Sequence, residues 1–530
     1  MSIPTLRALL LGFALVTPAA TWADEPKGTP PEQLGTVTFA NSCADAVQPE
    51  LQRAVKLLHS FWWEEGERAF RGVLERDPGC AIATWGIASI LLGNTFSPGP
   101  TPAQAQAANE AIAKGRALGA KTERERLYIE AIGAFYDRFS ERPQRARMKS
   151  LADAFGALAQ RFPDDDETQI FSALYLTATQ DPADKTFAAT LKAAAILQTQ
   201  FAKHPDHPGV AHYLIHSYDY PAIADKGLEA AMCYADIAPS APHALHMPSH
   251  IFTRVGAWKE SVATNVKSAA AAKAQGEPTS ALHATDYMVY ADLQMAHDRD
   301  AKRLMDEVGQ ANAAGPGPNA GPYATAAVPA RYAVERGAWA DAKRLQLAES
   351  RFPYTTAMTH FARAMGAARS GDPAGAEPDV QALGKIADEL KAKDGYWATE
   401  VEVQHLAAAA WLAHAKGQRD EALKQMRASA DMEDASEKSA VTPGRLLPAR
   451  ELLGDMLLES GRPADALAEY EASQTHDPKR FRGLYGAGRA AADAGNRDKA
   501  RYYFERLVAM TDGGDPRPEL TQAREYLAQN

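Results

Sequence analysis

The end of the chain repeats itself with a period of 34 residues. Four positions are matched 34 residues later by residues of the same kind: Gly454 by Gly488, Gly461 by Gly495, Ala466 by Ala500, and Tyr470 by Phe504. A fixed period of this size is the signature of repeat architectures, in which one unit cannot bury its apolar face alone and stacks on the next. This feature constrains the fold more than any other in the sequence.

The residues within each unit indicate its structure. Small residues stand where two helices would cross, an aromatic residue lies on the second helix, and a proline follows in Asp477-Pro478. These residues resemble the tetratricopeptide repeat. The resemblance implies an all-α fold, a right-handed superhelical solenoid of helix-turn-helix repeats, and a concave groove that holds a protein or peptide.

The same pattern recurs upstream with looser spacing. Gly66, Phe70 and Asp77-Pro78 keep the spacing of the C-terminal units, and Gly371 and Gly417 are candidate turns. In two further places a glycine is expected to end one helix and a tryptophan to begin its partner: Arg254-Val-Gly-Ala-Trp258 and Glu335-Arg-Gly-Ala-Trp339. We expect nine to twelve helix pairs over most of the chain.

The first residues read as a targeting segment. Arg7 is the only charged residue before Asp24, an apolar run covers residues 8–16, and small residues lead up to Ala23. This is the plan of a cleavable secretory signal peptide. The run is too short to cross about 30 Å of hydrocarbon, and no later stretch approaches a membrane span. We therefore expect a secreted protein, periplasmic in a Gram-negative source, so that the chain resembles an exported bacterial tetratricopeptide repeat (TPR) protein.

The Gly, Pro and Asp-Pro turns along the chain predict that it divides into six sections. They are a signal peptide (1–23), an N-terminal extended segment (24–45), N-terminal TPR-like repeats (46–200), His-rich central repeats (201–300), further TPR-like repeats (301–435) and C-terminal TPR repeats (436–530).

The net charge restricts the class of partner, and the cysteines predict one disulfide. A net charge of −10 argues against nucleic acid as a partner, because phosphate binding needs a basic surface. Cys43 and Cys80 flank the first predicted helix pair, and in an oxidising compartment we expect a disulfide between them. Cys233 is left over and is predicted to be a buried, inert thiol.

Histidine is the anomaly of this sequence. Eight of the fourteen histidines lie between positions 204 and 283. His212 and His216 are four residues apart, as are His246 and His250, and the two pairs are separated by one repeat length of 34 residues. Helical spacing would place each pair on one face, and the repeat would place the pairs side by side. The sequence thus predicts one shared site with these four ligands.

Imidazole ligands suit Zn, Cu and Fe, and a nearby carboxylate favours Fe or Zn. Asp219, His243 and His283 are further candidates for the metal site. Haem is less favoured, since no CxxCH motif is present. The competing interpretation is a histidine-lined peptide groove without metal.

Pro248 complicates this prediction because it should push Met247 away from helical angles. The second helix would then begin at Pro248 and leave His243 and His246 on a loop. The sequence leaves both arrangements open.

Other residues are candidates to bind a ligand or to complete the site: Asp286, Tyr287, Arg254 and Arg331. The aromatic run from His59 to Trp63 is interpreted as core packing rather than a cofactor site.

Two functions follow from these observations. One is an exported scaffold whose groove binds a protein or peptide and carries a transition-metal site; the alternative is a metal-dependent periplasmic enzyme, redox or hydrolytic, that uses the same histidines.

Overall fold

The structure is a computed structural model that describes residues 1, 32–97, 99–310, 319–348 and 350–529. The described residues from Gln33 onwards form one compact unit. The predicted signal peptide lies outside the described residues apart from Met1. The other predicted section boundaries stay predictions.

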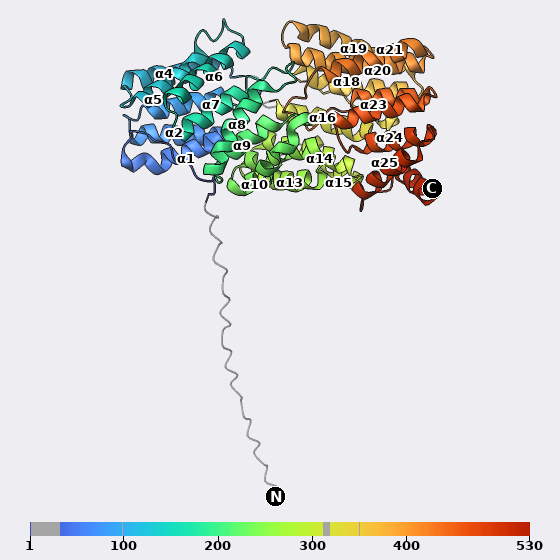
Figure 1. The fold of residues 1–530 in the computed structure, drawn as a ribbon, viewed down its shortest axis with the longest axis horizontal. Helices are drawn as coiled ribbons and strands as arrows, with labels where there is room; N and C mark the ends of the chain where they lie inside the picture. Colours follow the sequence, from blue (N-terminus) through green and yellow to red (C-terminus); the bar gives the residue numbers. More distant parts are fainter. Residues whose placement is uncertain (2–31, 98, 311–318, 349, 530) are drawn as a thin grey trace. The chain divides into compact units, whose positions relative to one another are not determined.

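The prediction of an all-α chain is confirmed, since the described residues form helices and no strand (Figure 1). Two short 3-10 helices are η1 (Asp45–Val47) and η2 (Pro221–Gly227). The α-helices are α1 (Gln48–His59), α2 (Trp63–Arg76), α3 (Ile82–Leu92), α4 (Pro102–Leu118), α5 (Glu123–Tyr136), α6 (Gln144–Arg161), α7 (Asp166–Thr177), α8 (Ala188–Lys203), α9 (Pro208–Tyr218), α10 (Leu228–Ile237), α11 (Pro242–His246), α12 (Pro248–Val255), α13 (Trp258–Ala274), α14 (Pro278–Gln294), α15 (Asp298–Gln310), α16 (Ala320–Glu335), α17 (Trp339–Ala342), α18 (Pro353–Arg369), α19 (Pro373–Lys391), α20 (Gly395–Ala415), α21 (Arg419–Asp434), α22 (Ala449–Glu459), α23 (Pro463–His476), α24 (Phe481–Asp493), α25 (Arg497–Met510) and α26 (Pro518–Gln529).

Helices that follow one another along the chain pack against one another, as in a helical solenoid. Two large apolar cores result, one drawn from residues 34–257 and one from residues 296–527. Two smaller clusters have their buried residues between Trp258 and Val328, a stretch that overlaps the start of the second core.

Glycine–aromatic contacts give the repeats their packing. A Cβ on Gly454 would lie 2.8 Å from the ring of Tyr470, and one on Gly488 would lie 2.6 Å from the ring of Phe504. Phe70 lies against Gly86 in the same way near the start of the array. The small residues therefore allow the helices to approach closely, and the TPR-like unit predicted from the sequence is confirmed.

The predicted helix turns are also confirmed. Gly256, Gly337, Gly371 and Gly417 all have positive φ, between 62° and 79°. A residue with a Cβ is strained at such angles, and glycine is the usual residue that ends a helix there. Trp258 and Trp339 begin the helices that follow the first two turns.

The segment before the first helix is held by a disulfide. Residues 33–44 contain no helix, and Cys43 is bonded to Cys80, as predicted. Cys233 is the free cysteine, and the prediction that it is buried is wrong: it is partly exposed on α10, with its Sγ 3.3 Å from the carbonyl of Glu229.

The C-terminal repeats pack back onto the centre of the chain. Arg480, fully buried just before α24, donates to Tyr290 Oη on α14 at 2.8 Å and to Glu335 on α16 at 2.6 Å. The side chain of Gln294 accepts a hydrogen bond from the Phe481 backbone at 2.9 Å. The centre of the array is therefore covered by its own chain.

Within the described residues, we find no helix with the length and apolar character needed to span a membrane.

Candidate metal centre

Six of the central histidines converge from four helices. α9 carries His212 and His216, α11 carries His243 and His246, α12 carries His250, and α14 carries His283. Pro208 begins α9, and the His207 side chain accepts from the backbone N–H of Val210, so that sequence-local features fix where this helix starts.

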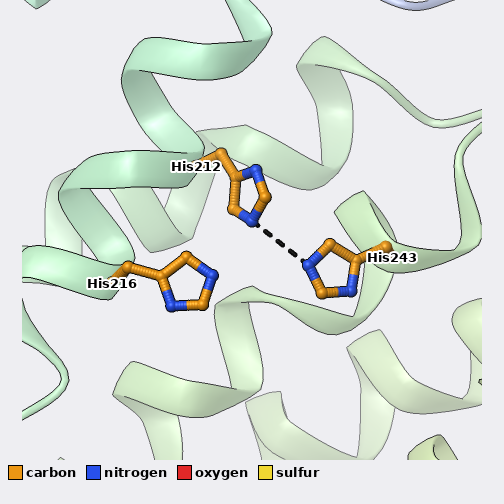
Figure 2. Close-up of side chains that lie close together, drawn as sticks. All are labelled: His212, His216 and His243. Carbon is orange, nitrogen blue, oxygen red and sulfur yellow. Dashed lines mark hydrogen bonds between the residues drawn. The ribbon is translucent and has the colours of Figure 1, made fainter. Parts of the chain in front are cut away.

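The six histidines divide into two groups of three. The first triplet is His212, His216 and His243; the second triplet is His246, His250 and His283. Within each triplet, one ring nitrogen per residue lies within 4.8 Å of the others. Figure 2 shows the first triplet, with the rings of His212 and His243 in contact.

This grouping corrects the prediction of one four-ligand site. His212 and His216 share a triplet with His243, whereas His246 and His250 share one with His283. The reason is that α11 directs His243 towards the first triplet and His246 towards the second, where His250 of α12 also lies. Two residues named as secondary candidates, His243 and His283, thus join the candidate ligands.

The structure also decides between the two arrangements left open at Pro248. α12 does begin at Pro248, yet Met247 keeps helical angles (φ −54°, ψ −35°), and His243 and His246 lie on the short helix α11. The expectation that Pro248 displaces Met247 from the helical region is wrong. His246 and His250 remain neighbours, with ring centroids 5.0 Å apart.

Hydrogen bonds fix the protonation of two rings in the second triplet. His246 Nδ1 lies 2.7 Å from Asn265 Oδ1, and the amide nitrogen of Asn265 donates to the carbonyl of Ser261 at 2.8 Å. His250 Nδ1 lies 3.0 Å from Asp219 Oδ2. Because both partners can only accept, both Nδ1 atoms carry the proton and both Nε2 atoms present a lone pair.

These two lone pairs face each other. The Nε2 atoms of His246 and His250 are 3.1 Å apart. Tyr287 Oη lies 3.4 Å from His250 Nε2, but its proton has acceptors at 3.2 Å in the carbonyls of Ala440 and Thr442. Two neutral imidazoles in this arrangement repel unless a cation lies between them.

The first triplet is built in a similar way. His212 Nδ1 donates to the carbonyl of His59 at 2.7 Å, which directs its Nε2 lone pair towards His243 Nε2 at 3.1 Å. His216 Nε2 is buried and has no hydrogen-bond partner among the residues that the structure describes. A buried polar atom without a partner is costly, and a metal ion would satisfy it.

Burial keeps the six imidazoles neutral. It lowers the pKa of every member of both triplets, to about 3 for His283. Neighbouring histidines lower these pKa values further, for example His216 acting on His212. Neutral imidazole is the form that binds a metal, so the cluster needs no deprotonation at neutral pH.

Asp219 supports the site from outside the ligand set. Its Oδ1 accepts from Arg254 Nε at 2.8 Å and lies 3.6 Å from Lys438 Nζ. Burial by itself would raise the pKa of Asp219, but Lys438 and Arg254 hold it well below its usual value. Carboxylates that orient a histidine ligand in this way raise its basicity.

The four predicted ligand-binding residues have different surroundings. Tyr287 lies at the second triplet, its ring centroid 4.6 Å from that of His246. Arg254 holds Asp219, whereas Arg331 pairs with Asp286 at 3.3 Å and donates to the carbonyl of Gly444 at 3.1 Å. Arg331 and Asp286 thus fasten the segment between α21 and α22 rather than line the histidine cluster.

Aromatic rings enclose the first triplet. Phe96 stacks on His216 with centroids 4.0 Å apart, Phe61 lies 4.4 Å from His212, and Tyr234 stacks on His212 at 5.3 Å. Phe61 adopts a left-handed conformation with φ of 52°, which is strained for a residue with a Cβ. The aromatic run around Phe61 therefore packs in the core, as predicted, and it packs against the candidate ligands.

A third cluster, His59, Glu167 and His207, is satisfied by its own hydrogen bonds. His207 Nδ1 accepts from the Val210 backbone, and its Nε2 lies 3.0 Å from Glu167 Oε1. His59 Nε2 also lies 3.0 Å from Glu167 Oε2. These hydrogen bonds leave His207 without a free lone pair for a metal. The bond from the Val210 backbone also fixes the start of α9, the helix that carries His212.

Three groups that contact the site were not predicted from the sequence. Asn265 lies a full helix away on α13, Lys438 arrives from the segment between α21 and α22, and the His59 carbonyl is a backbone group. Only Asn265 left a signal that could have been used: it is the one amide side chain on a face of α13 that otherwise holds Trp258 and small residues.

Comparison with known proteins adds little to this geometry. No protein family matches the chain, and no curated protein matches its sequence. A tetratricopeptide repeat protein from Parabacteroides merdae is 11% identical, covering 76% of this chain and 98% of its own, with a TM-score of 0.24. Human IFIT1, solved as a dimer with m7Gppp-AAAA, is 11% identical, covering 81% and 90%, with a TM-score of 0.33. Similarities this low carry no argument about this chain, whose repeat architecture rests on the helix packing described above.

Proposed function

We propose that this chain is a transition-metal protein whose functional centre is the six-histidine cluster, held by a TPR-like helical scaffold. One observation carries the proposal: the Nε2 atoms of His246 and His250 lie 3.1 Å apart although the Nδ1 atom of each ring already faces an acceptor, Asn265 Oδ1 or Asp219 Oδ2. A metal ion at that position would turn a repulsive contact into two coordinate bonds.

The number of ligands in each triplet favours a catalytic role for the metal. Each triplet offers three imidazoles, and tetrahedral metals bound by three protein ligands keep a fourth position for water or substrate. A metal-dependent enzyme is therefore supported over a scaffold with a saturated four-histidine site. Asp219 and Asn265 would hold His250 and His246 in the ligating orientation.

Partner binding is a second candidate, supported by a surface whose lining contains no histidine. A groove of about 530 Å³ lies along α4 and α5, lined by Asn109, Arg116, Tyr136, Asp137, Arg138 and Phe139. A protein or peptide bound there would use the helical array in the manner that the resemblance to TPR proteins implies.

Export of the protein belongs to the same proposal. The disulfide between Cys43 and Cys80 supports it, because such bonds persist in oxidising compartments. Amino-terminal sequencing of protein from the periplasmic fraction of a Gram-negative host should begin at Asp24, and an uncleaved Met1 would contradict export by a signal peptide.

The test of the metal function is elemental analysis of the purified full chain beside the double variant His246→Ala/His250→Ala. We expect stoichiometric metal in the wild type and its loss in the variant. His405→Ala is the matched control, since His405 contacts Glu402 far along the chain on α20 and should keep the metal. A folded wild-type protein that takes up no transition metal would refute the proposal.

A further inference from the structure

We infer that the two histidine triplets together hold two copper ions as one dinuclear centre. This inference rests on the proposed metal function and adds the number of ions, their identity and their closeness. It concerns ligands that all belong to this chain.

The two triplets are structurally joined. The short helix α11 supplies one ligand to each triplet, His243 to the first and His246 to the second, with ring centroids 6.2 Å apart. A second pair of rings, His216 and His250, connects the triplets at 5.9 Å. Ions bound to these rings would be near neighbours rather than separate sites.

Each triplet has ligand atoms that point at the same place. In the first, the Nε2 atoms of His212 and His243 are 3.1 Å apart; in the second, those of His246 and His250 are also 3.1 Å apart. Two nitrogens bound to one ion at about 2.0 Å in tetrahedral geometry are roughly 3.3 Å apart. Both triplets are therefore close to a coordinating geometry before any side chain moves.

The chemistry of the donor set selects the metal. Neither triplet contains a carboxylate or a thiolate, and Asp219, the carboxylate nearest the second triplet, is engaged by His250 Nδ1 and Arg254. Manganese favours carboxylate ligands, whereas imidazole suits zinc, iron and copper, and of these copper binds most tightly in the Irving–Williams order.

The charge of the bound ions also favours copper, in the Cu(I) state. His212, His216, His246 and His250 are all at most 6% exposed, and an uncompensated charge in such an environment is costly. Two divalent ions would bring four positive charges to a site beside which the Asp219 carboxylate already faces Arg254 and Lys438. Two Cu(I) ions would bring half that charge, and three neutral imidazoles satisfy Cu(I) without a further ligand.

One ligand of each triplet is partly accessible to solvent. His243 and His283 are partly exposed, whereas the other four ligands are buried. These two histidines are therefore the positions at which an ion enters, and they are the least disruptive to replace.

The test is a titration of metal-free full-length protein with Cu(I) under anaerobic conditions, in competition with a chromophoric chelator, followed by oxidation and electron paramagnetic resonance (EPR). We expect two copper ions per chain and an oxidised spectrum altered by spin interaction between the two ions. His243→Ala and His283→Ala should each bind one copper and give the spectrum of an isolated Cu(II) ion, with full intensity per copper. His405→Ala should behave as the wild type does.

The possible failures are distinguishable. No uptake of copper, zinc or any other transition metal would refute the proposed function itself. One copper per chain, two magnetically isolated ions, or two zinc ions retained in preference to copper would overturn the dinuclear copper inference and leave the metal function intact. The stoichiometry and spectrum of the wild type decide the matter even if one variant does not fold.

Discussion

Residues outside the ligand set determine what the histidines can do. Asn265 accepts from His246 Nδ1, Asp219 accepts from His250 Nδ1, and the His59 carbonyl accepts from His212 Nδ1. Each bond leaves an Nε2 lone pair directed into the cluster. Removing such a partner commonly lowers metal affinity about 10- to 100-fold.

Asn265→Leu should therefore weaken metal binding by about 10- to 100-fold, because His246 would lose the acceptor that fixes its tautomer. Asn265→Asp is the matched control, since it keeps an acceptor oxygen at the same place and should retain most of the affinity. Competition titration with a chelator measures both. Equal affinities for the wild type and Asn265→Leu would show that this bond does not orient a ligand.

The metal-free protein should lose stability in acid. Burial lowers the pKa of all six histidines, to about 3 for His283, from about 6.5 in an unfolded chain. Below pH 6.5 the unfolded chain then binds more protons than the folded one. The free energy of unfolding falls as the pH falls, by up to about 1.4 kcal/mol per pH unit for each histidine.

Urea unfolding of the metal-free protein between about pH 7 and pH 5 measures this slope. His283→Gln should show a shallower slope than the wild type, because one titrating group has been removed. Slopes that are equal within error would mean that His283 titrates normally in the folded protein.

At the scale of the element, the repeat depends on small residues under aromatic rings. Tyr470 on α23 packs against both Gly454 on α22 and Gly486 on α24, so that one ring joins three helices. The 34-residue period marked Tyr470 and Gly454 in advance. The period did not identify Gly486, because Gly486 is not one of the residues that recur 34 positions apart.

Gly486→Ala should destabilise the protein by about 1–3 kcal/mol, because the new Cβ would overlap the Tyr470 ring. Gly72→Ala is the control. Gly72 lies inside α2 with no atom near the position of a Cβ, so that alanine should stabilise by about 0.5–1 kcal/mol through helix propensity. Thermal or urea unfolding compares the two; equal effects would contradict this packing account.

The sequence predicted the local elements of this fold better than its site. Turn glycines, the tryptophans that begin helices and the Cys43–Cys80 bond follow from short-range patterns. The division of the histidines into two triplets does not, because it depends on how α11 and α12 are oriented on either side of Met247. The roles of Asn265 and Lys438 depend on contacts across 19 and more than 200 residues, which no local pattern encodes.

At the scale of the whole molecule, the C-terminal repeats cover the central ones. Arg480 is fully buried between Glu335, Glu451 and Tyr290 and links α24 to α14 and α16. The segment between α21 and α22 brings Lys438 to Asp219 and the carbonyls of Ala440 and Thr442 to Tyr287. The array thus encloses its histidine centre with residues from its own second half.

Arg480→Ala should cost about 3–5 kcal/mol, since it leaves Glu335 and Glu451 buried without their cation. Lys499→Ala is the control: Lys499 pairs with Glu471 at the surface, and its loss should cost less than about 1 kcal/mol. Urea unfolding distinguishes the two. A small effect of Arg480→Ala would mean that the C-terminal repeats are not fastened to the centre through this residue.

Anomalous X-ray diffraction from crystals of the copper-loaded full chain would locate a metal among the six histidines. We expect two anomalous peaks, one bound by His212, His216 and His243 and the other by His246, His250 and His283. Peaks at surface histidines alone, with the Nε2 atoms of His246 and His250 bridged by nothing, would contradict this expectation.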